Sequence, residues 1–140
     1  MTGEFRARFP NTRRAVGFAR RSLIAHIAAY GYAGGDLADI ETAVGEALAN
    51  AAEHGHRAGS GFEVRSYVER DRLVIEVQDE GGGFRPAEAN APQAASDAPR
   101  GFGIYLMRHF MDEVDYNERG TCVRLTKRLP VARRHGASCG

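Results

Sequence analysis

The sequence is poor in cysteine, in net charge and in long apolar runs, and each shortage excludes a class of protein. Only Cys122 and Cys139 are present, which suggests neither a disulfide framework nor a CxxC metal site. A formal net charge of +1 gives no general electrostatic reason to bind nucleic acid or a membrane. No stretch approaches the ~18 apolar residues of a membrane helix, and the N-terminus lacks an apolar signal region. We therefore expect a protein of the reducing cytoplasm.

Basic residues are concentrated toward the two ends of the chain. Residues 1–21 hold six arginines against a single glutamate, and residues 127–134 hold four further basic side chains. A solvated surface is the simpler interpretation, and docking of an acidic partner protein is the alternative. With 140 residues, 43% of them hydrophobic, the chain suits one globular domain. We expect that domain to span residues 1–129, followed by a flexible tail over 130–140.

The order of hydrophobic patterns predicts both helices and strands. Period-two alternation predicts strands over residues 4–9, 61–69, 73–77 and 121–129. Helical spacing predicts one helix from a cap at Asn11 or Thr12 to about Tyr30, and another from an Asp36 cap to about His54. A short helix is expected over 101–110. The fold class that follows is a two-layer α/β (α+β) sandwich, with a mixed, mostly antiparallel sheet and three helices on one face.

The periodicity fails between about residues 80 and 100. This segment contains three consecutive glycines, three prolines and many alanines. A loop of about twenty residues inside a small domain is usually either functional or disordered. We expect a lid over a binding site.

The predicted second helix carries a pair of polar residues, Glu46 and Asn50. A spacing of four places both side chains on one helical face, about one turn apart. Asparagine is a poor helix former, so its position inside a helix asks for a reason. Its neutral oxygen suits a hard cation such as Mg²⁺, and a neighbouring carboxylate can serve as a general base. An ordinary solvated helix face explains the same pattern when it is taken alone.

Two glycine motifs complete the candidate site. Asp79 ends a hydrophobic strand and is followed by Gly81 and Gly83, where backbone can approach a ligand closely. Gly101 and Gly103 open the helix after the long loop, and free N–H groups at a helix start attract phosphate. The sequence contains no Walker GxxxxGK[ST] motif, no complete dinucleotide fingerprint, no GxSxG elbow, no zinc-ligand spacing and no nucleic-acid-binding signature.

The ordered set E-x-x-x-N, D-x-G-x-G and G-x-G-x-x-L resembles the Bergerat-type ATPase superfamily shared by gyrase, histidine kinases and mismatch-repair proteins. The chain length and the stretch Phe110-Met111-Asp112-Glu113-Val114 look most like the anti-sigma factor serine/threonine kinases. The resemblance covers roughly residues 4–129.

The resemblance implies a role for each matching residue. Asn50 matches the asparagine that holds Mg²⁺ against the ATP phosphates, and Glu46 matches the proposed catalytic base. Asp79 matches the aspartate that binds the adenine amino group, with Thr121 nearby. Gly81 and Gly83 match the adenine end of the pocket, whereas Gly101 and Gly103 match the phosphate end. A lid arginine near the γ-phosphate is also implied, with Arg100 and Arg85 as the two candidates.

The resemblance further implies the activity and the partners. The expected function is phosphorylation of a STAS-fold anti-sigma factor antagonist, together with sequestration of a sigma factor by a kinase homodimer. Two other functions remain open. One is a regulatory module that binds ATP and sequesters a partner without phosphotransfer, and the other is a free-standing ATPase.

Overall fold

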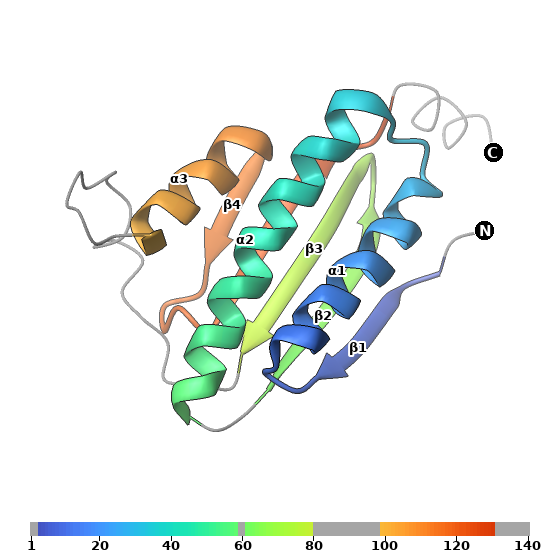
Figure 1. Cartoon of the computed structure of the whole chain (residues 1–140). Helices are drawn as coiled ribbons and strands as arrows, with labels where there is room; N and C mark the ends of the chain where they lie inside the picture. The colour runs from blue at the N-terminus through green and yellow to red at the C-terminus, as the bar shows by residue number, and fades with distance from the viewer. Residues whose placement is uncertain (1–2, 59–60, 80–98, 131–140) are drawn as a thin grey trace.

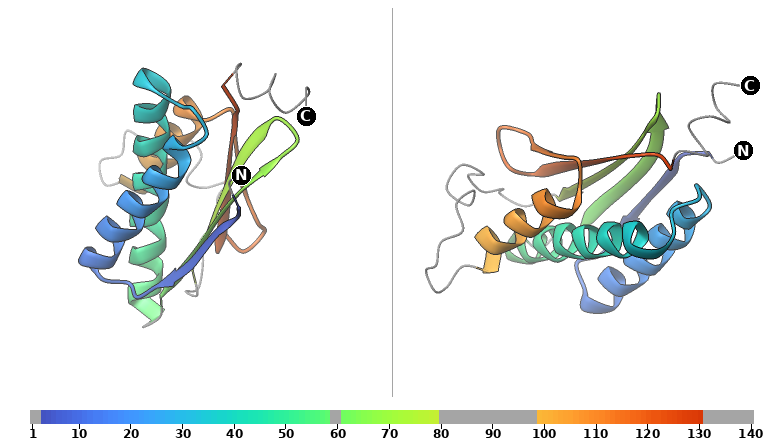
Figure 2. Two further views of the ribbon diagram at one scale, coloured as in Figure 1. Left: turned by 90° about the vertical axis from the view of Figure 1, so that its right-hand side faces the viewer. Right: turned by 90° about the horizontal axis from the view of Figure 1, so that it is seen from above.

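The computed structural model of the chain describes residues 3–58, 61–79 and 99–130. Its elements are β1 (Phe5–Phe9), α1 (Arg13–Ala28), α2 (Gly34–Ala58), β2 (Phe62–Glu69), β3 (Arg72–Asp79), α3 (Pro99–Phe110), β4 (Glu113–Tyr116) and β5 (Cys122–Arg128). Figure 1 shows α2 lying along the sheet between α1 and α3, and the side view in Figure 2 shows the three helices on one face. The predicted two-layer α/β sandwich is confirmed.

The sheet has five strands in the order β1-β2-β3-β5-β4. A mixed, mostly antiparallel sheet was expected, and all four pairings among the described residues are antiparallel. The chain leaves β3, reaches the edge strand β4 by way of α3, and returns through a hairpin as β5. Strand β5 therefore lies between β3 and β4, so residues at the end of β3 meet residues at the start of β5.

Strand β4 is the one element that the sequence patterns do not predict. It has only four residues, and their burial alternates over a single buried side chain, Val114. Four residues are too few for a periodicity to be recognised. The strand forms because its register with β5 places Val114 opposite Leu125 and Tyr116 opposite Val123, which are tertiary partners.

The core lies between the helices and the inner face of the sheet. On α1 the buried residues recur every four positions, Ala15, Ala19, Leu23 and Ile27. Fully buried side chains also come from the other helices and the sheet, among them Ile40, Val44, Leu48, Met107, Phe62, Val64, Leu73, Ile75 and Leu125. Burying each large aliphatic side chain contributes about 1.5–3 kcal/mol. This packing fixes α2, the helix that carries Glu46 and Asn50.

Two helix boundaries are informative. Thr12, rather than Asn11, caps α1, since its Oγ1 accepts a 3.1 Å hydrogen bond from the Ala15 N–H. Helix α2 begins at Gly34, so Asp36 lies in its first turn and is not its cap, and it continues past Gly55 to Ala58. A helical glycine costs only about 1 kcal/mol relative to alanine, less than the packing of one large core residue stabilises.

Tyr32, between α1 and α2, anchors the helical layer to the end of β5. Its side chain is 5% exposed, and its hydroxyl lies 2.6 Å from the Arg128 carbonyl oxygen and 3.1 Å from that of Lys127. The single hydroxyl proton is therefore shared between two acceptors of the same strand.

Replacing Tyr32 by phenylalanine removes that hydroxyl and leaves the ring in place. We expect Tyr32→Phe to lower the free energy of unfolding by about 0.5–1.5 kcal/mol, the usual net value of a lost hydrogen bond. Urea denaturation followed by circular dichroism measures it. Tyr105→Phe is the matched control, because Tyr105 is 47% exposed; equal stability of Tyr32→Phe and wild type would contradict the anchoring role.

Candidate functional site

Glu46 and Asn50 lie on the side of α2 that faces α3, and both are half-buried. The contact is unusually close at Gly103 of α3. A Cβ atom at Gly103 would lie 2.7 Å from Glu46 Oε1 and 3.7 Å from Asn50 Nδ2. A real Cβ does not tolerate the first distance, so a larger residue at position 103 would displace the Glu46 carboxylate from its place beside α3. The structure thus brings together three of the predicted site residues from segments more than fifty positions apart.

A second group of site residues gathers at the end of β3. The Asp79 backbone N–H donates a 2.8 Å hydrogen bond to the Thr121 carbonyl oxygen, which continues the β3–β5 pairing beyond the strand ends. The Asp79 side chain is 5% exposed and Thr121 is 9% exposed. A carboxylate accepts hydrogen bonds and donates none, so its position at the pocket makes Asp79 a candidate acceptor for a polar ligand group.

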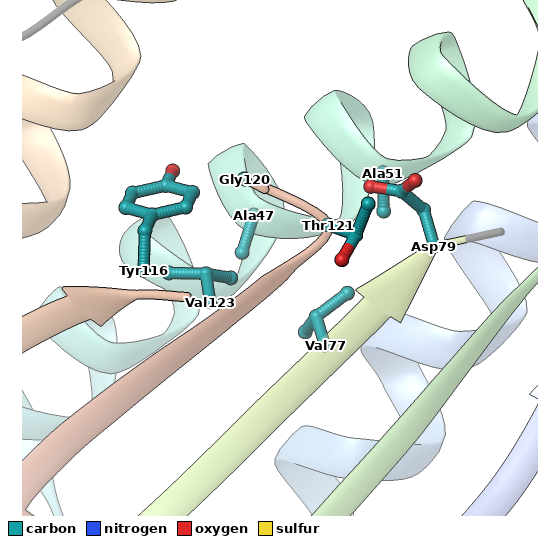
Figure 3. A pocket seen from close by; sticks show the side chains of 8 residues that line it. All are labelled: Ala47, Ala51, Val77, Asp79, Tyr116, Gly120, Thr121 and Val123. Carbon is teal, nitrogen blue, oxygen red and sulfur yellow. The ribbon is translucent and has the colours of Figure 1, made fainter. Parts of the chain in front are cut away.

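Asp79 and Thr121 line a pocket between α2 and the sheet (Figure 3). The remaining lining residues are Ala47, Ala51, Val77, Tyr116, Gly120 and Val123. Two of them, Ala47 and Ala51, belong to α2 and flank the position of Asn50, so their small side chains leave space beside the helix. An apolar wall with a carboxylate at one end suits a flat ligand that has a hydrogen-bond donor on its edge.

The pocket wall at Thr121 is held by Asn117, a residue that the sequence analysis did not select. Asn117 Oδ1 accepts hydrogen bonds from the Thr121 N–H at 2.9 Å and the Cys122 N–H at 3.2 Å. Its Nδ2 donates to Thr121 Oγ1 at 2.9 Å. Gly120, with φ of 71°, makes the turn possible. The Asn and Gly of this segment are a turn signal, which is the clue in the sequence.

Tyr116 is the second residue that the sequence analysis did not select. Burial raises the pKa of its phenol to about 12. The nearby Asn50 amide and the positive charge of Arg108 act in the opposite direction, and the Asp79 charge adds to the increase. The phenol is therefore protonated at neutral pH. No sequence signal marks Tyr116, because its position on the inner face follows from the unpredicted strand β4.

Several predicted site residues lie partly or wholly beyond what the structure describes. Gly81, Gly83 and Arg85 fall outside the described residues, as does most of the expected lid. Gly101 and Arg100 belong to the first turn of α3, but the Arg100 side chain is not described. Among the described residues, no group of three His, Cys, Asp or Glu side chains could hold a metal ion. A cation at Asn50 would need most of its ligands from elsewhere, such as phosphate oxygens and water.

The described residues fit a nucleotide and a phosphate-bound cation. The missing Cβ of Gly103 keeps the start of α3 close to Glu46 and Asn50, where helix N–H groups attract phosphate. Asn50 offers a neutral oxygen ligand, and Asp79 offers a buried acceptor for an amino group. Asp79 lines the pocket together with Ala47 and Ala51, which belong to the same helix as Asn50. The arrangement suits a ligand with a flat base at one end and phosphates at the other.

Comparison with known proteins agrees with this geometry. Residues 9–127 match the family described as histidine kinase-like ATPase domain, and the chain belongs to that family of ATP-using domains. It is 35% identical over 127 residues to a protein of Bacillus pumilus named serine-protein kinase RsbW, covering 81% of this chain and 78% of the relative. It is also 31% identical over 138 residues to an anti-sigma F factor of Bacillus licheniformis, covering 92% and 94%.

Solved structures support the fold. The chain superimposes on a structure of the RsbU and RsbW domains of Rv1364c from Mycobacterium tuberculosis with a TM-score of 0.66 and 22% identity. The match covers 91% of this chain but only 33% of the solved chain, so the present chain spans about a third of that protein's solved length. In the described part of the chain, no helix is long and apolar enough to cross a membrane.

The contact at Gly103 generates a direct prediction. Gly103→Ala forces the Glu46 carboxylate to move, but that carboxylate ends a flexible side chain. We therefore expect the free energy of unfolding to change by less than about 1 kcal/mol, while ATP turnover falls about 10- to 100-fold because the carboxylate is displaced. Urea denaturation and a phosphate-release or transfer assay measure the two effects.

Gly35→Ala is the matched control for Gly103→Ala. Gly35 also lies in a helix, and a Cβ there would meet nothing within 4 Å. We expect Gly35→Ala to keep full turnover. Unimpaired turnover in Gly103→Ala would show that the close approach of α3 to α2 does not matter for the site.

Proposed function

We propose that this protein is a serine/threonine kinase that acts as an anti-sigma factor, transferring the γ-phosphate of ATP to a hydroxyl of a partner protein. The observation that carries the proposal is the placement of the Glu46 carboxylate against Gly103, one helical turn from Asn50. A site that only binds a nucleotide has no need of a carboxylate near the phosphates, where it repels them. The names of the relatives, serine-protein kinase and anti-sigma F factor, support the same function.

Each end of the pocket has a separate task. Asp79 accepts a hydrogen bond from the adenine amino group, Thr121 lies beside it, and Gly81 and Gly83 shape that end. The first turn of α3, which includes Gly101, presents free backbone N–H groups to the phosphates, and Gly103 in the next turn leaves room beside Glu46. Arg100 or Arg85 is the arginine near the γ-phosphate. Asn50 Oδ1 would hold Mg²⁺, which when bound neutralises phosphate charge.

Phosphoryl transfer depends mainly on positioning and on charge stabilisation. Glu46 accepts the proton of the attacking serine or threonine hydroxyl, so a carboxylate oxygen gains the proton as the new O–P bond forms and the bond between the γ-phosphorus and the bridging oxygen of ADP breaks. The approach of α3 to α2 holds that oxygen in place, because Gly103 and the buried side chains Ile104 and Met107 pack α3 against the core. The lid over residues 80–100 would exclude water and so favour transfer over hydrolysis.

The partners are proposed from the resemblance to the anti-sigma factor kinases, and the name anti-sigma F factor of one relative supports the sigma factor. The substrate is a STAS-fold anti-sigma factor antagonist, and the sequestered protein is a sigma factor held by a kinase homodimer. Phosphorylation of the antagonist would keep the sigma factor sequestered. Both partners place the protein in the cytoplasm. The domain itself is proposed to span residues 1–129, with residues 130–140 as a tail.

One experiment distinguishes the kinase from the two alternatives, a free-standing ATPase and a module that binds ATP without phosphotransfer. The protein is incubated with γ-labelled ATP and a serine-bearing STAS antagonist. Stable label on the antagonist is the outcome expected of the kinase. Phosphate release without label on the antagonist would indicate an ATPase, and neither product would indicate a module that only binds and sequesters.

Glu46→Ala tests the proposed base. We expect ATP affinity to stay within a few-fold of wild type, whereas label transfer falls by about 100-fold or more, within the range that general base catalysis supplies. Calorimetry measures binding, and the transfer assay measures the rate. Glu41→Ala is the control, because Glu41 is an exposed carboxylate on the same helix. Transfer by Glu46→Ala at the wild-type rate would exclude Glu46 as the base.

Asp79→Asn tests the adenine end. An amide oxygen is a poorer acceptor than a carboxylate, and the amide NH₂ also opposes the adenine amino group. We expect ATP affinity to fall about tenfold or more, as for the loss of a charge-assisted hydrogen bond. Asp115→Asn, at an exposed position of β4, should bind ATP as wild type does. Unchanged affinity of Asp79→Asn in calorimetry would remove Asp79 from this role.

A further inference from the structure

We propose that Lys127 is a positioning residue for the phosphate end of the site: it holds the C-terminal end of α3 in place, and thereby sets where Gly103 lies beside Glu46. The functional part of this inference rests on the proposed function, whereas the placement of α3 does not. The structure brings Lys127 to the stretch of residues 110–114, which supports the family resemblance but has no part in the mechanism described above.

Lys127 is half-buried on the inner face of the sheet. Along β5 it continues the alternation of inward-facing side chains set by Val123 and Leu125, and it pairs with Leu73 of β3. Its carbonyl oxygen also accepts a hydrogen bond from the Tyr32 hydroxyl at 3.1 Å. The backbone of Lys127 is therefore held in place, and its charged group, among apolar neighbours, needs a hydrogen-bond acceptor within reach.

The acceptor is the C-terminal end of α3. Lys127 Nζ donates a 2.6 Å hydrogen bond to the carbonyl oxygen of Phe110, the last residue of that helix. The carbonyl groups of a last helical turn have no partner within the helix, and they carry the negative end of the helix dipole, which a lysine stabilises. The bond is charge-assisted, and such bonds are about twice as strong as those between neutral groups.

Asp112 adds two bonds directly after the helix. Its Oδ2 accepts the Arg128 backbone N–H at 2.7 Å, and its own N–H donates to the Thr126 carbonyl oxygen at 2.9 Å. Thr126, Lys127 and Arg128 are consecutive residues of β5, so one short stretch of that strand binds the end of α3. Figure 1 shows α3 lying beside α2 and leading from this end into β4.

These bonds define the position of α3 along its own axis. Ile104 and Met107 bury the helix against the core, but apolar contact is non-directional, whereas hydrogen bonds at one end are directional. Gly103 lies seven residues before Phe110, about 10 Å along the helix at 1.5 Å per residue. A displacement of the C-terminal end therefore moves Gly103 as well, and it changes the space beside the Glu46 carboxylate.

The placement of α3 can be tested in the free protein, without nucleotide or metal. Lys127→Met keeps most of the stem and removes the ammonium group. In the ¹⁵N–¹H spectrum, the backbone signal of Gly103 is identified by its absence in Gly103→Ala. We expect Lys127→Met to shift this signal. The control is Thr12→Ala, which removes the cap of α1 and so destabilises a different helix; it should leave the signal in place.

An unshifted Gly103 signal in folded Lys127→Met would overturn the inference and leave the proposed kinase function standing. Asp112→Ala covers the case in which Lys127→Met does not fold, because Asp112 is exposed and its carboxylate belongs to the same contact. We expect it to shift the Gly103 signal as well, whereas Asp115→Ala, also exposed, should not. Equal Gly103 signals in these two variants would likewise contradict the inference.

The consequence for the site is measured by chemical-shift titration with ATP and Mg²⁺ and, separately, with adenosine, which has the base but no phosphates. We expect Lys127→Met to weaken ATP binding about three- to tenfold, the equivalent of about one hydrogen bond. Adenosine affinity should change less than twofold, because the pairing of β3 with β5 positions Asp79 beside Thr121 independently of α3.

A purely structural helix cap predicts a different result. Lys127→Met would then lower the unfolding temperature, as Thr12→Ala does, and leave both affinities unchanged, which would overturn the inference. Equal weakening of ATP and adenosine would overturn it too, because the effect would not be confined to the phosphate end. Wild-type protein that binds no ATP would overturn the proposed function, but not the shift of the Gly103 signal.

Discussion

The close approach of α3 to α2 at Gly103 is the constraint on which the site depends. A Cβ atom at this position would lie 2.7 Å from Glu46 Oε1 and 3.7 Å from Asn50 Nδ2, so its absence leaves space for the Glu46 carboxylate beside α3. Three requirements of the proposed mechanism would meet there: a helix start near the phosphates, a carboxylate for the proton and a neutral amide for a cation. Because all three share one interhelical contact, a small displacement of α3 alters each of them at once.

Helix α2 joins this contact to the rest of the molecule. One of its faces contributes Ile40, Val44 and Leu48 to the core, and this packing fixes both its position and its rotation. Its other side carries Glu46 and Asn50, and Ala47 and Ala51 line the pocket that ends at Asp79. Packing of the helix against the core therefore holds the candidate catalytic groups in place. The helix also runs from the proposed phosphate end of the pocket to the proposed adenine end.

The strand order gives the pocket its other wall. Because β5 lies between β3 and β4, Thr121 meets Asp79 and Tyr116 comes onto the same inner face. The turn between β4 and β5 is held by Asn117, which uses both ends of its side chain. In this wall, backbone pairing determines which side chains face the nucleotide, while side-chain hydrogen bonds determine how they are oriented.

The sequence by itself determined the two-layer fold, the extent of most elements and the family, because helical and strand periodicities and ordered motifs are local properties. It also identified Glu46, Asn50, Asp79, Gly103 and Thr121 as candidates, although the patterns could not show that they meet. Only the tertiary structure decided that Glu46 and Asn50 lie beside Gly103, that β4 exists, and that Tyr116 and Asn117 belong to the site. These facts depend on strand pairing and helix packing between distant segments, and a short strand such as β4 leaves no periodicity of its own.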